Sequence, residues 1–208
     1  MSEYDNKQDS KKDYEKEQYT FFAMMSRMKF INRWGLMRNT FKENDSEHSL
    51  EVAMIAHALA TIHNLYYGGN IHAERVALYA MYHDVTEIIT GDLPTPVKYD
   101  APEIKAAYRT VEEKAIVQLL ERLPLEMKPL YETLLDETKQ EAEYRKYVKA
   151  ADKISALIKC LEEKNMGNMD FLKAEQSIRQ TIASMDMPEV EFFMNHFLNA
   201  YSLTLDEQ

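Results

Sequence analysis

The chain has 208 residues and a formal net charge of −10, from 25 Lys and Arg residues against 35 Asp and Glu residues. This length favours one domain with a substantial core. The acidic balance argues against binding to nucleic-acid polymers, which relies on Lys and Arg patches, but it allows one small anionic ligand held by a local cluster. Five glycines and six prolines are about 5% of the chain, against roughly 12% in ordinary proteins. This shortage of turn residues argues against a many-stranded sandwich or barrel and favours long helices.

The cysteine content and the hydropathy pattern predict a cytoplasmic protein that does not enter a membrane. Cys160 is the only cysteine, which excludes an intramolecular disulfide framework and a cysteine-rich zinc site and favours a reducing compartment. The N-terminal residues have no apolar stretch of the kind that a signal peptide needs. Residues 52–73 have no charged side chain, but His, Asn and Gly interrupt them, and a membrane span needs about 20 consistently apolar residues.

The chain begins with a highly charged segment, residues 1–18, which we interpret as a tail, and residues 19–208 are expected to form the folded domain. Apolar residues recur at spacings of three and four over about 20–31, which predicts a first helix. A polar loop, 39–46, precedes a second helix, for which Asp45 or Ser46 is the predicted N-cap. The residues Gly68-Gly69-Asn70 end this helix, and a third is predicted from about Ala73 to Thr90.

The clearest break in the sequence is the segment 91–96, because two prolines and a glycine in six residues cannot continue a helix. Further helices are predicted over about 102–122, 125–136, 139–165, 170–184 and 188–200. We find no internal repeat and no linker that would divide the chain. The predicted fold is therefore all-α, a single compact domain of seven or eight helices.

The pair His83-Asp84 lies inside an apolar run and is the first candidate for chemistry. Burial of a carboxylate costs several kcal/mol unless a cation compensates it, and no basic residue lies within a helical turn of Asp84. A divalent metal is therefore a reasonable partner. Glu87 follows His83 by four residues and Asp84 by three, so we expect all three to lie on or beside one helical face.

Two residues from other parts of the chain could complete a metal site. His48 is predicted at the start of a helix, and Asp152 lies in an apolar helical stretch. Two imidazoles and two carboxylates form a mixed nitrogen and oxygen site that suits a divalent transition metal. For Asp152 alone, an ion pair with Lys149 or Lys153 is the more ordinary interpretation, and spacing does not establish that the four residues converge.

The order of these four residues resembles the H…HD…D signature of the HD-domain metal-dependent phosphohydrolases. Longer strings resemble the bacterial 5'-deoxynucleotidase family within that superfamily, and they are Ile31-Asn32-Arg33-Trp34, Leu36-Met37-Arg38-Asn39, Ser46-Glu47-His48-Ser49-Leu50, Tyr82-His83-Asp84 and Thr90-Gly91-Asp92-Leu93-Pro94-Thr95-Pro96-Val97-Lys98-Tyr99. The resemblance covers about residues 18–207. It implies an all-helical, usually dimeric protein that removes phosphate from deoxyribonucleoside 5'-monophosphates with one divalent metal ion, such as Co²⁺, Mn²⁺ or a similar transition metal.

The resemblance also implies roles for individual residues. The metal ligands would be His48, His83, Asp84 and Asp152. Arg33 and Trp34 would contact the nucleotide, with Arg33 orienting the phosphate. The sugar side of the pocket would be lined by Asp92, Leu93, Pro94 and Thr95, and the substrate would also touch Asp84 and Asp152.

Three side chains are candidates for the reaction itself. Glu87 lies beside the ligand pair without being needed for coordination, so we expect it to orient or deprotonate the attacking water; the ordinary alternative is a surface carboxylate. The guanidinium of Arg33 can hold two phosphate oxygens, whereas an Arg-Trp pair is otherwise common in helix-end packing. Asp92 could bond the sugar hydroxyl or protonate the leaving oxygen, or it could cap a turn.

Two other functions are compatible with the sequence. One is an HD phosphohydrolase that acts on nucleoside triphosphates or cyclic nucleotides. The other is a helical protein that binds nucleotides without turnover. The expected partners are a nucleotide substrate and a second copy of the chain.

Overall fold

The computed structural model describes residues 18–94 and 101–208, so nearly all of the predicted tail lies outside the described residues. In that part of the chain the α-helices are α1 (Phe21–Met25), α2 (Asp45–Tyr66), α3 (Ala73–Met81), α4 (Glu87–Thr90), α6 (Pro102–Leu120), α7 (Lys128–Leu135), α8 (Ala142–Asn165), α9 (Leu172–Ala183) and α10 (Pro188–His196). The 3₁₀-helices are η2 (Ser26–Phe30), η3 (Glu137–Lys139), η4 (Met169–Phe171), η5 (Leu198–Ser202) and η6 (Leu205–Glu207). The predicted all-α fold is confirmed: the described residues form an isolated β-bridge, Asn32 to Asn44, but no β-strand.

The helix predicted from Ala73 to Thr90 is wrong in one respect, because a turn divides it into α3 and α4. Over this turn the backbone N–H groups bond three residues back, as Val85 does to Tyr82 and Glu87 to Asp84, which is tighter than an α-helix. His83 and Asp84 therefore lie in a turn and share no helical face with Glu87. This division also explains why the described part of the chain has nine α-helices and not seven or eight.

The N-cap of α2 is Asn44, so the prediction of Asp45 or Ser46 is wrong. The Asn44 side chain accepts hydrogen bonds from the backbone N–H groups of Ser46 and Glu47, and the Glu47 carboxylate accepts one from Asn44 N. This reciprocal capping box satisfies N–H groups that a helix start leaves unpaired. As a consequence, Asp45 is the first residue of the helix, and it is fully buried.

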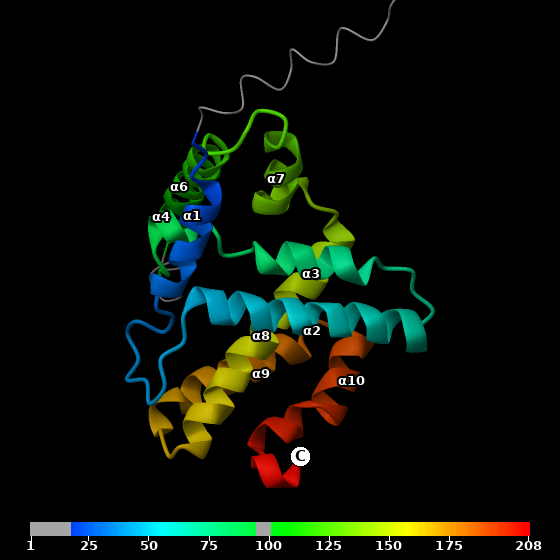
Figure 1. Cartoon of the computed structure of the whole chain (residues 1–208). Helices are drawn as coiled ribbons and strands as arrows, with labels where there is room; N and C mark the ends of the chain where they lie inside the picture. Colours follow the sequence, from blue (N-terminus) through cyan, green and yellow to red (C-terminus); the bar gives the residue numbers. More distant parts are fainter. Residues whose placement is uncertain (1–17, 95–100) are drawn as a thin grey trace, which may run out of the picture.

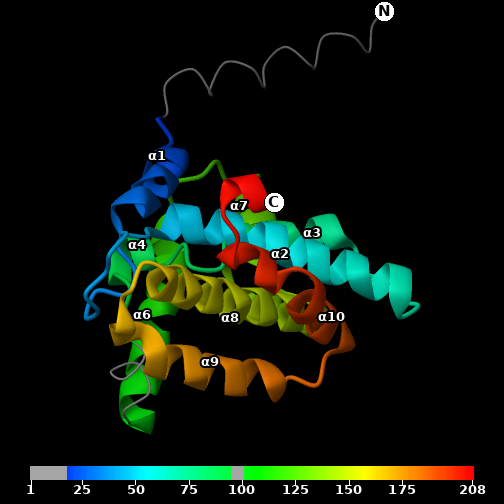
Figure 2. The same ribbon diagram turned by 90° about the horizontal axis from the view of Figure 1, so that it is seen from below.

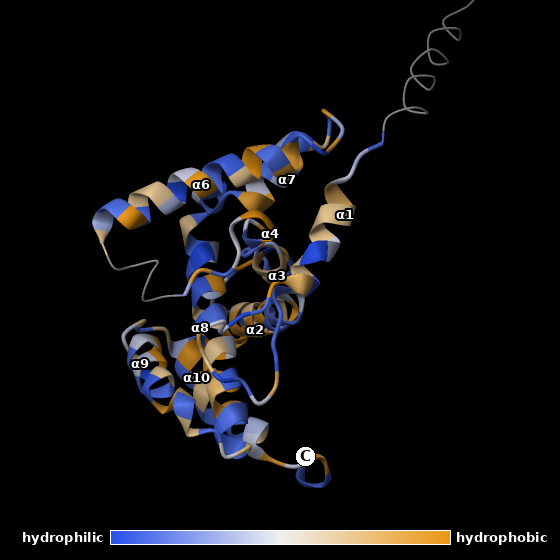
Figure 3. Cartoon of the chain, turned by 90° about the vertical axis from the view of Figure 1, so that its left-hand side faces the viewer, coloured by the Kyte–Doolittle hydropathy of each residue, from blue (hydrophilic) through white to orange (hydrophobic). Residues whose placement is uncertain are grey.

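The centre of the molecule is formed by α2, α3, α8 and α10. In Figures 1 and 2, α2 and α3 lie side by side and cross α8, while α9 runs along the other side of α8. The side chains of Leu59, Tyr79, Tyr147 and Ile154 are buried in this core. Figure 3 shows that α2 is largely hydrophobic, whereas α6 and α9 alternate between hydrophobic and hydrophilic residues.

A second, smaller core connects α1, α6 and α7, and it includes Phe21, Leu119 and Leu135. The turn between α3 and α4 joins the two cores, because Ala80 belongs to the larger one and Val85 to the smaller one. The His83-Asp84 pair therefore lies at the junction of the two cores, near the first turn of α2. None of the described helices combines the length and the apolar character that crossing a bilayer requires.

Candidate active site

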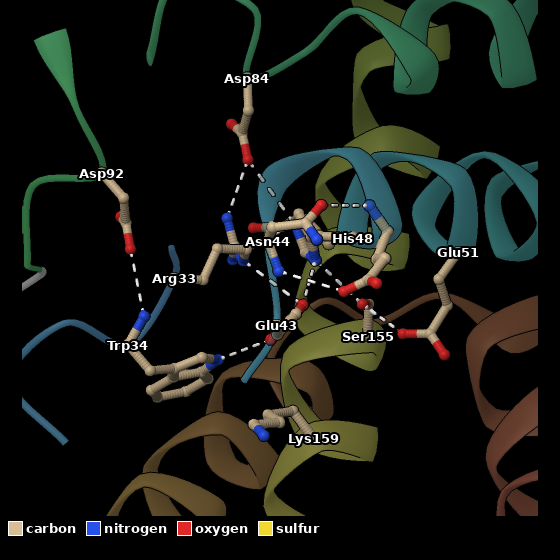
Figure 4. A network of polar contacts seen from close by, with 12 residues as sticks. Arg33, Trp34, Glu43, Asn44, His48, Glu51, Asp84, Asp92, Ser155 and Lys159 are labelled. Carbon is tan, nitrogen blue, oxygen red and sulfur yellow. Dashed lines mark hydrogen bonds and ion pairs between the residues drawn. The ribbon is translucent and has the colours of Figure 1, made fainter. Parts of the chain in front are cut away.

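Side chains from three segments meet at the start of α2. His48 Nε2 lies 3.2 Å from Asp152 Oδ1, on α8, and 3.6 Å from Asp84 Oδ2. His83 Nε2 lies 3.0 Å from the same Asp84 oxygen. One ligand atom from each of His48, His83 and Asp84 lies within 4.8 Å of the other two. His48, His83 and Asp84 thus form one group, and Asp152 adjoins it through its contact with His48. Figure 4 shows His48 and Asp84 within this network.

The protonation of the two imidazoles suits a metal. His83 Nδ1 lies 2.7 Å from the Ala80 carbonyl oxygen, so it must donate there. His48 Nδ1 lies 3.0 Å from Ser155 Oγ, and that hydroxyl donates its own proton to Glu51 Oε2 at 2.5 Å. These contacts place a proton on each Nδ1, so that Nε2 is the nitrogen that each ring would offer to a metal in its neutral form. Partners of this kind are typical behind metal-ligating histidines.

The two Nε2 atoms are also buried without a hydrogen bond, although buried polar atoms are nearly always satisfied. Carboxylate oxygens lie close to both of them, but not in hydrogen-bond geometry. Burial alone would lower the pKa of His48, yet the Asp152 and Glu43 carboxylates raise it to about 9, which shows how negative the surroundings are. Two orphaned imidazole nitrogens facing two carboxylates fit a divalent transition metal.

The two aspartates also contact cations of the chain. Arg33 Nη1 donates to Asp84 Oδ2 at 3.0 Å, and Arg33 Nη2 lies 4.0 Å from Asp152 Oδ1. Burial would raise the pKa of each aspartate. For Asp84, His83 and then Arg33 hold the pKa below its usual value, and for Asp152, His48 and then Lys153 do so. Lys153 pairs with Asp152 Oδ2 at 2.9 Å. The ion pair that the sequence offers as the ordinary interpretation is therefore present, and the other oxygen of Asp152 still faces His48.

Arg33 and Trp34 lie in a loop between η2 and α2, and helix-end packing does not describe them. Trp34 has a φ of 58°, a conformation that costs a residue other than glycine about 1–3 kcal/mol. Its backbone N–H donates to Asp92 Oδ2 at 3.2 Å, and its ring lies against Phe171, with the centroids 5.2 Å apart. The contacts with Asp92 and Phe171 therefore stabilise the strained backbone conformation of Trp34.

Glu87 is buried, with 7% of its surface exposed, so the alternative of a surface carboxylate is wrong. Its Oε2 has no hydrogen-bond partner. Burial and the negative charges of Asp84, Asp45 and Asp92 raise the pKa of Glu87 to about 10. A cation among the aspartates would act in the opposite direction. Glu87 is thus a proton-holding group next to the proposed ligands.

Asp92 follows Gly91, whose φ of 73° favours glycine. Burial raises the pKa of Asp92, while Arg33 opposes that shift. Leu93 and Pro94 come next and are partly buried. The prediction for Thr95 lies outside the described residues.

Several polar residues of the site were missed from the sequence, among them Glu43, Asp45, Glu51 and Ser155. For Glu51 and Ser155, the spacing in the sequence could have indicated a place in the site. Glu51 follows His48 by three residues, and Ser155 follows Asp152 by three, a spacing that places side chains on one helical face. Glu43 lies in a loop without periodicity, so no such signal exists for it.

Backbone groups of the loop that carries Glu43 form hydrogen bonds with a buried ion pair of α8. Lys159 Nζ lies 2.5 Å from Glu163 Oε1 and also donates to the carbonyl of Phe41. Glu163 accepts hydrogen bonds from the backbone N–H groups of Thr40 and Phe41 and from Asn168 Nδ2. Burial alone would raise the pKa of Glu163, but these donors lower it to about 2.

Comparison with known proteins identifies close relatives. The family model described as 5'-deoxynucleotidase YfbR-like matches residues 20–201. Proteins named 5'-deoxynucleotidase from Yersinia pestis (strain Pestoides F) and Yersinia pseudotuberculosis (serotype O:3, strain YPIII) are each 50% identical over 187 residues, which is 90% of this chain and 95% of theirs.

Solved structures share the fold. An HD-domain phosphohydrolase from Listeria innocua is 26% identical, with a TM-score of 0.77 over 88% of each chain. The HD phosphohydrolase of cyanophage S-2L, bound to dA and one catalytic Zn²⁺ ion, is 21% identical, with a TM-score of 0.64 over 85% of this chain and 95% of that one.

Proposed function

Because this chain belongs to the YfbR-like 5'-deoxynucleotidase family, we propose that it hydrolyses deoxyribonucleoside 5'-monophosphates to deoxyribonucleoside and phosphate. The observation that carries this proposal is the meeting of two orphaned imidazole nitrogens with the carboxylates of Asp84 and Asp152 beside the guanidinium of Arg33. In such a site the imidazoles and carboxylates would bind a metal, and the guanidinium of Arg33 would bind a phosphate.

The metal would be held by His48, His83, Asp84 and Asp152. A divalent ion such as Co²⁺ or Mn²⁺ supplies an activated water and neutralises phosphate oxygens when it is bound. Two nitrogen and two oxygen donors suit a transition metal better than Mg²⁺ or Ca²⁺, which prefer oxygen ligands alone.

The remaining residues would bind and orient the substrate and move protons. Arg33 would hold two phosphate oxygens, and Trp34 would contact the nucleoside. The positive charge of a bound metal would lower the pKa of Glu87. Glu87 would then be ionised, and its unpartnered Oε2 would orient the attacking water and accept a proton from it. Asp92 would hold a proton for the leaving 5'-oxygen, and the sugar would lie against Leu93, Pro94 and Thr95.

The test is the release of phosphate from a panel of nucleotides by chelated protein, with and without added Mn²⁺, Co²⁺ or Mg²⁺. We expect release from deoxyribonucleoside 5'-monophosphates that depends on the metal. Equal rates on ribonucleoside monophosphates would contradict the deoxy preference, and preferred turnover of triphosphates or cyclic nucleotides would favour the other phosphohydrolase function. Protein that binds nucleotide but regains no activity with any metal would be a binding protein.

We also propose a homodimer, as the sequence resemblance implies. Leu50, Met54 and Leu65 lie on one face of α2 and are 52%, 62% and 71% exposed. That face continues into an apolar groove of about 990 Å³ between α2 and α10, lined by Tyr66 and Phe192 among others. A second copy is the partner that we assign to this surface. Light scattering should give twice the monomer mass, and Leu65→Glu should lower it; a monomeric wild-type protein would contradict the proposal.

Residues 19–208 are proposed as the catalytic domain, which agrees with the family match over residues 20–201. We infer a cytoplasmic location, in which the buried thiol of Cys160 stays reduced.

A further inference from the structure

Glu43 lies where the side chains of Arg33, Trp34 and His48 meet (Figure 4). Its Oε1 is 3.2 Å from His48 Nδ1 and 3.5 Å from Arg33 Nε. Its Oε2 accepts a hydrogen bond of 3.0 Å from Trp34 Nε1. Only 13% of the side chain is exposed. One carboxylate thus contacts a residue proposed for the phosphate, one for the nucleoside and one for the metal.

The backbone holds Glu43 in this place independently of its side chain. Arg33 N donates to the carbonyl of Glu43 at 3.0 Å, next to the antiparallel bridge between Asn32 and Asn44. From the other side, Lys159 and Glu163 fix the backbone of residues 40 and 41 to α8. The loop is therefore fixed on both sides of Glu43, which places the carboxylate next to Arg33, Trp34 and His48.

Among the carboxylates around Arg33, Glu43 contacts a different nitrogen of the guanidinium. Asp84 and Asp152 face Nη1 and Nη2, the terminal nitrogens of the guanidinium, and both are proposed metal ligands. Glu43 faces Nε. This ion pair at Nε would anchor the guanidinium without using its terminal nitrogens. A phosphate would bind through the paired N–H groups of those nitrogens once the proposed metal takes the aspartate oxygens.

Trp34 needs such an anchor more than most residues, because its backbone adopts a left-handed conformation. Asp92 holds its backbone N–H, and Glu43 holds the indole N–H. We propose that Glu43 is a positioning residue that orients Arg33 and Trp34 together for nucleotide binding and connects both to the ligand His48. The identity of the nucleotide rests on the proposed function; the positioning of the two side chains does not.

The fluorescence of Trp34 tests this proposal without turnover, because Trp34 is the only tryptophan of the chain. In Glu43→Gln, the N–H donors of Trp34 and His48 compete for a single amide oxygen, and the ion pair with Arg33 Nε is lost. We expect a shifted emission maximum in the metal-loaded variant. Titration with the two products, inorganic phosphate and a deoxyribonucleoside, should show dissociation constants raised by about tenfold.

Kinetics give the second readout. For Glu43→Gln we expect KM to rise about tenfold while kcat changes less than about threefold. The matched control is Glu47→Gln, which removes an exposed charge from the same region and keeps a residue that suits a capping box. Its emission, affinities and KM should equal those of the wild type.

A double-mutant cycle links the two residues. Trp34→Phe removes the indole donor, so its effect on KM and that of Glu43→Gln should combine to less than their sum. If Glu43→Gln does not fold, Glu43→Asp replaces it in each measurement, with smaller changes of the same sign. Unchanged emission and product affinity, additive effects, or a loss of thermal stability and kcat with KM unchanged would each overturn the proposal. A wild-type protein without phosphatase activity would refute the proposed function instead and leave the fluorescence result standing.

Discussion

Ser155 connects His48 to Glu51 through two successive hydrogen bonds, of 3.0 and 2.5 Å. The hydroxyl can accept from the imidazole only because it gives its own proton to the carboxylate. At the residue scale, this arrangement fixes both the tautomer and the orientation of the ring. Ser155, which is not itself a proposed ligand, would therefore decide which nitrogen His48 offers to the proposed metal.

Ser155→Ala should weaken the binding of the metal by about 10- to 100-fold, because the imidazole loses the partner that fixes its tautomer. Calorimetric titration of chelated protein with Co²⁺ or Mn²⁺ measures this. Ser177→Ala, an exposed serine on α9, is the control and should bind as the wild type does. An unchanged affinity in Ser155→Ala would show that Glu43 alone orients His48.

Glu87→Gln should lower kcat by about 10²- to 10⁴-fold, the usual contribution of a general base, while metal and product affinities stay near those of the wild type. Steady-state kinetics with saturating metal measures the first, and calorimetry the second. Glu74→Gln, an exposed carboxylate on α3, is the control. Normal turnover by Glu87→Gln would remove Glu87 from the mechanism.

At the scale of elements, the loop between η2 and α2 is attached to α8 through Glu163. Its depressed pKa means that the carboxylate favours the folded state above pH 4.5 and that this contribution disappears as the pH falls towards about 2. A change of this size corresponds to roughly 3 kcal/mol of unfolding free energy at neutral pH.

Glu163→Gln should therefore be less stable than the wild type by about 3 kcal/mol at pH 7, and the difference should shrink at pH 3. Urea unfolding at both pH values measures it. Glu162→Gln changes the neighbouring, exposed residue of α8 and should cost less than about 0.5 kcal/mol. A stability difference that does not depend on pH would contradict the assignment of the shift to Glu163.

Helical elements were predictable where apolar periodicity is strong, as along α2 and α8, and less so where tertiary contacts decide. The turn at His83 and Asp84 was missed because its apolar flanks continue a helical pattern on both sides. The site shows the same limit. Sequence patterns name His48 and Asp152, but the place of Glu43 depends on a loop with a strained Trp34, and no local pattern encodes such a loop.

At the scale of the whole molecule, the proposed ligands come from segments that lie far apart in the sequence. His48 lies in the first turn of α2, Asp152 belongs to α8, and the His83-Asp84 turn joins the two cores. The acidic total of the chain is compatible with an anionic substrate, because a dication and Arg33 would offset the negative charges of the carboxylates at this junction.

The double contact of Arg33 with Asp84 and Asp152 has a thermodynamic consequence. A metal that took these oxygens would compete with the guanidinium, and the released Nη1 and Nη2 atoms would then become available to an anion. Cation and anion would thus be heterotropic ligands with positive coupling, and reciprocity would require each to raise the affinity of the other by the same factor. Inorganic phosphate should therefore tighten metal binding in calorimetry, about fivefold or more, and Arg33→Ala should abolish this coupling. Metal affinities that do not depend on phosphate would show that the two bind independently.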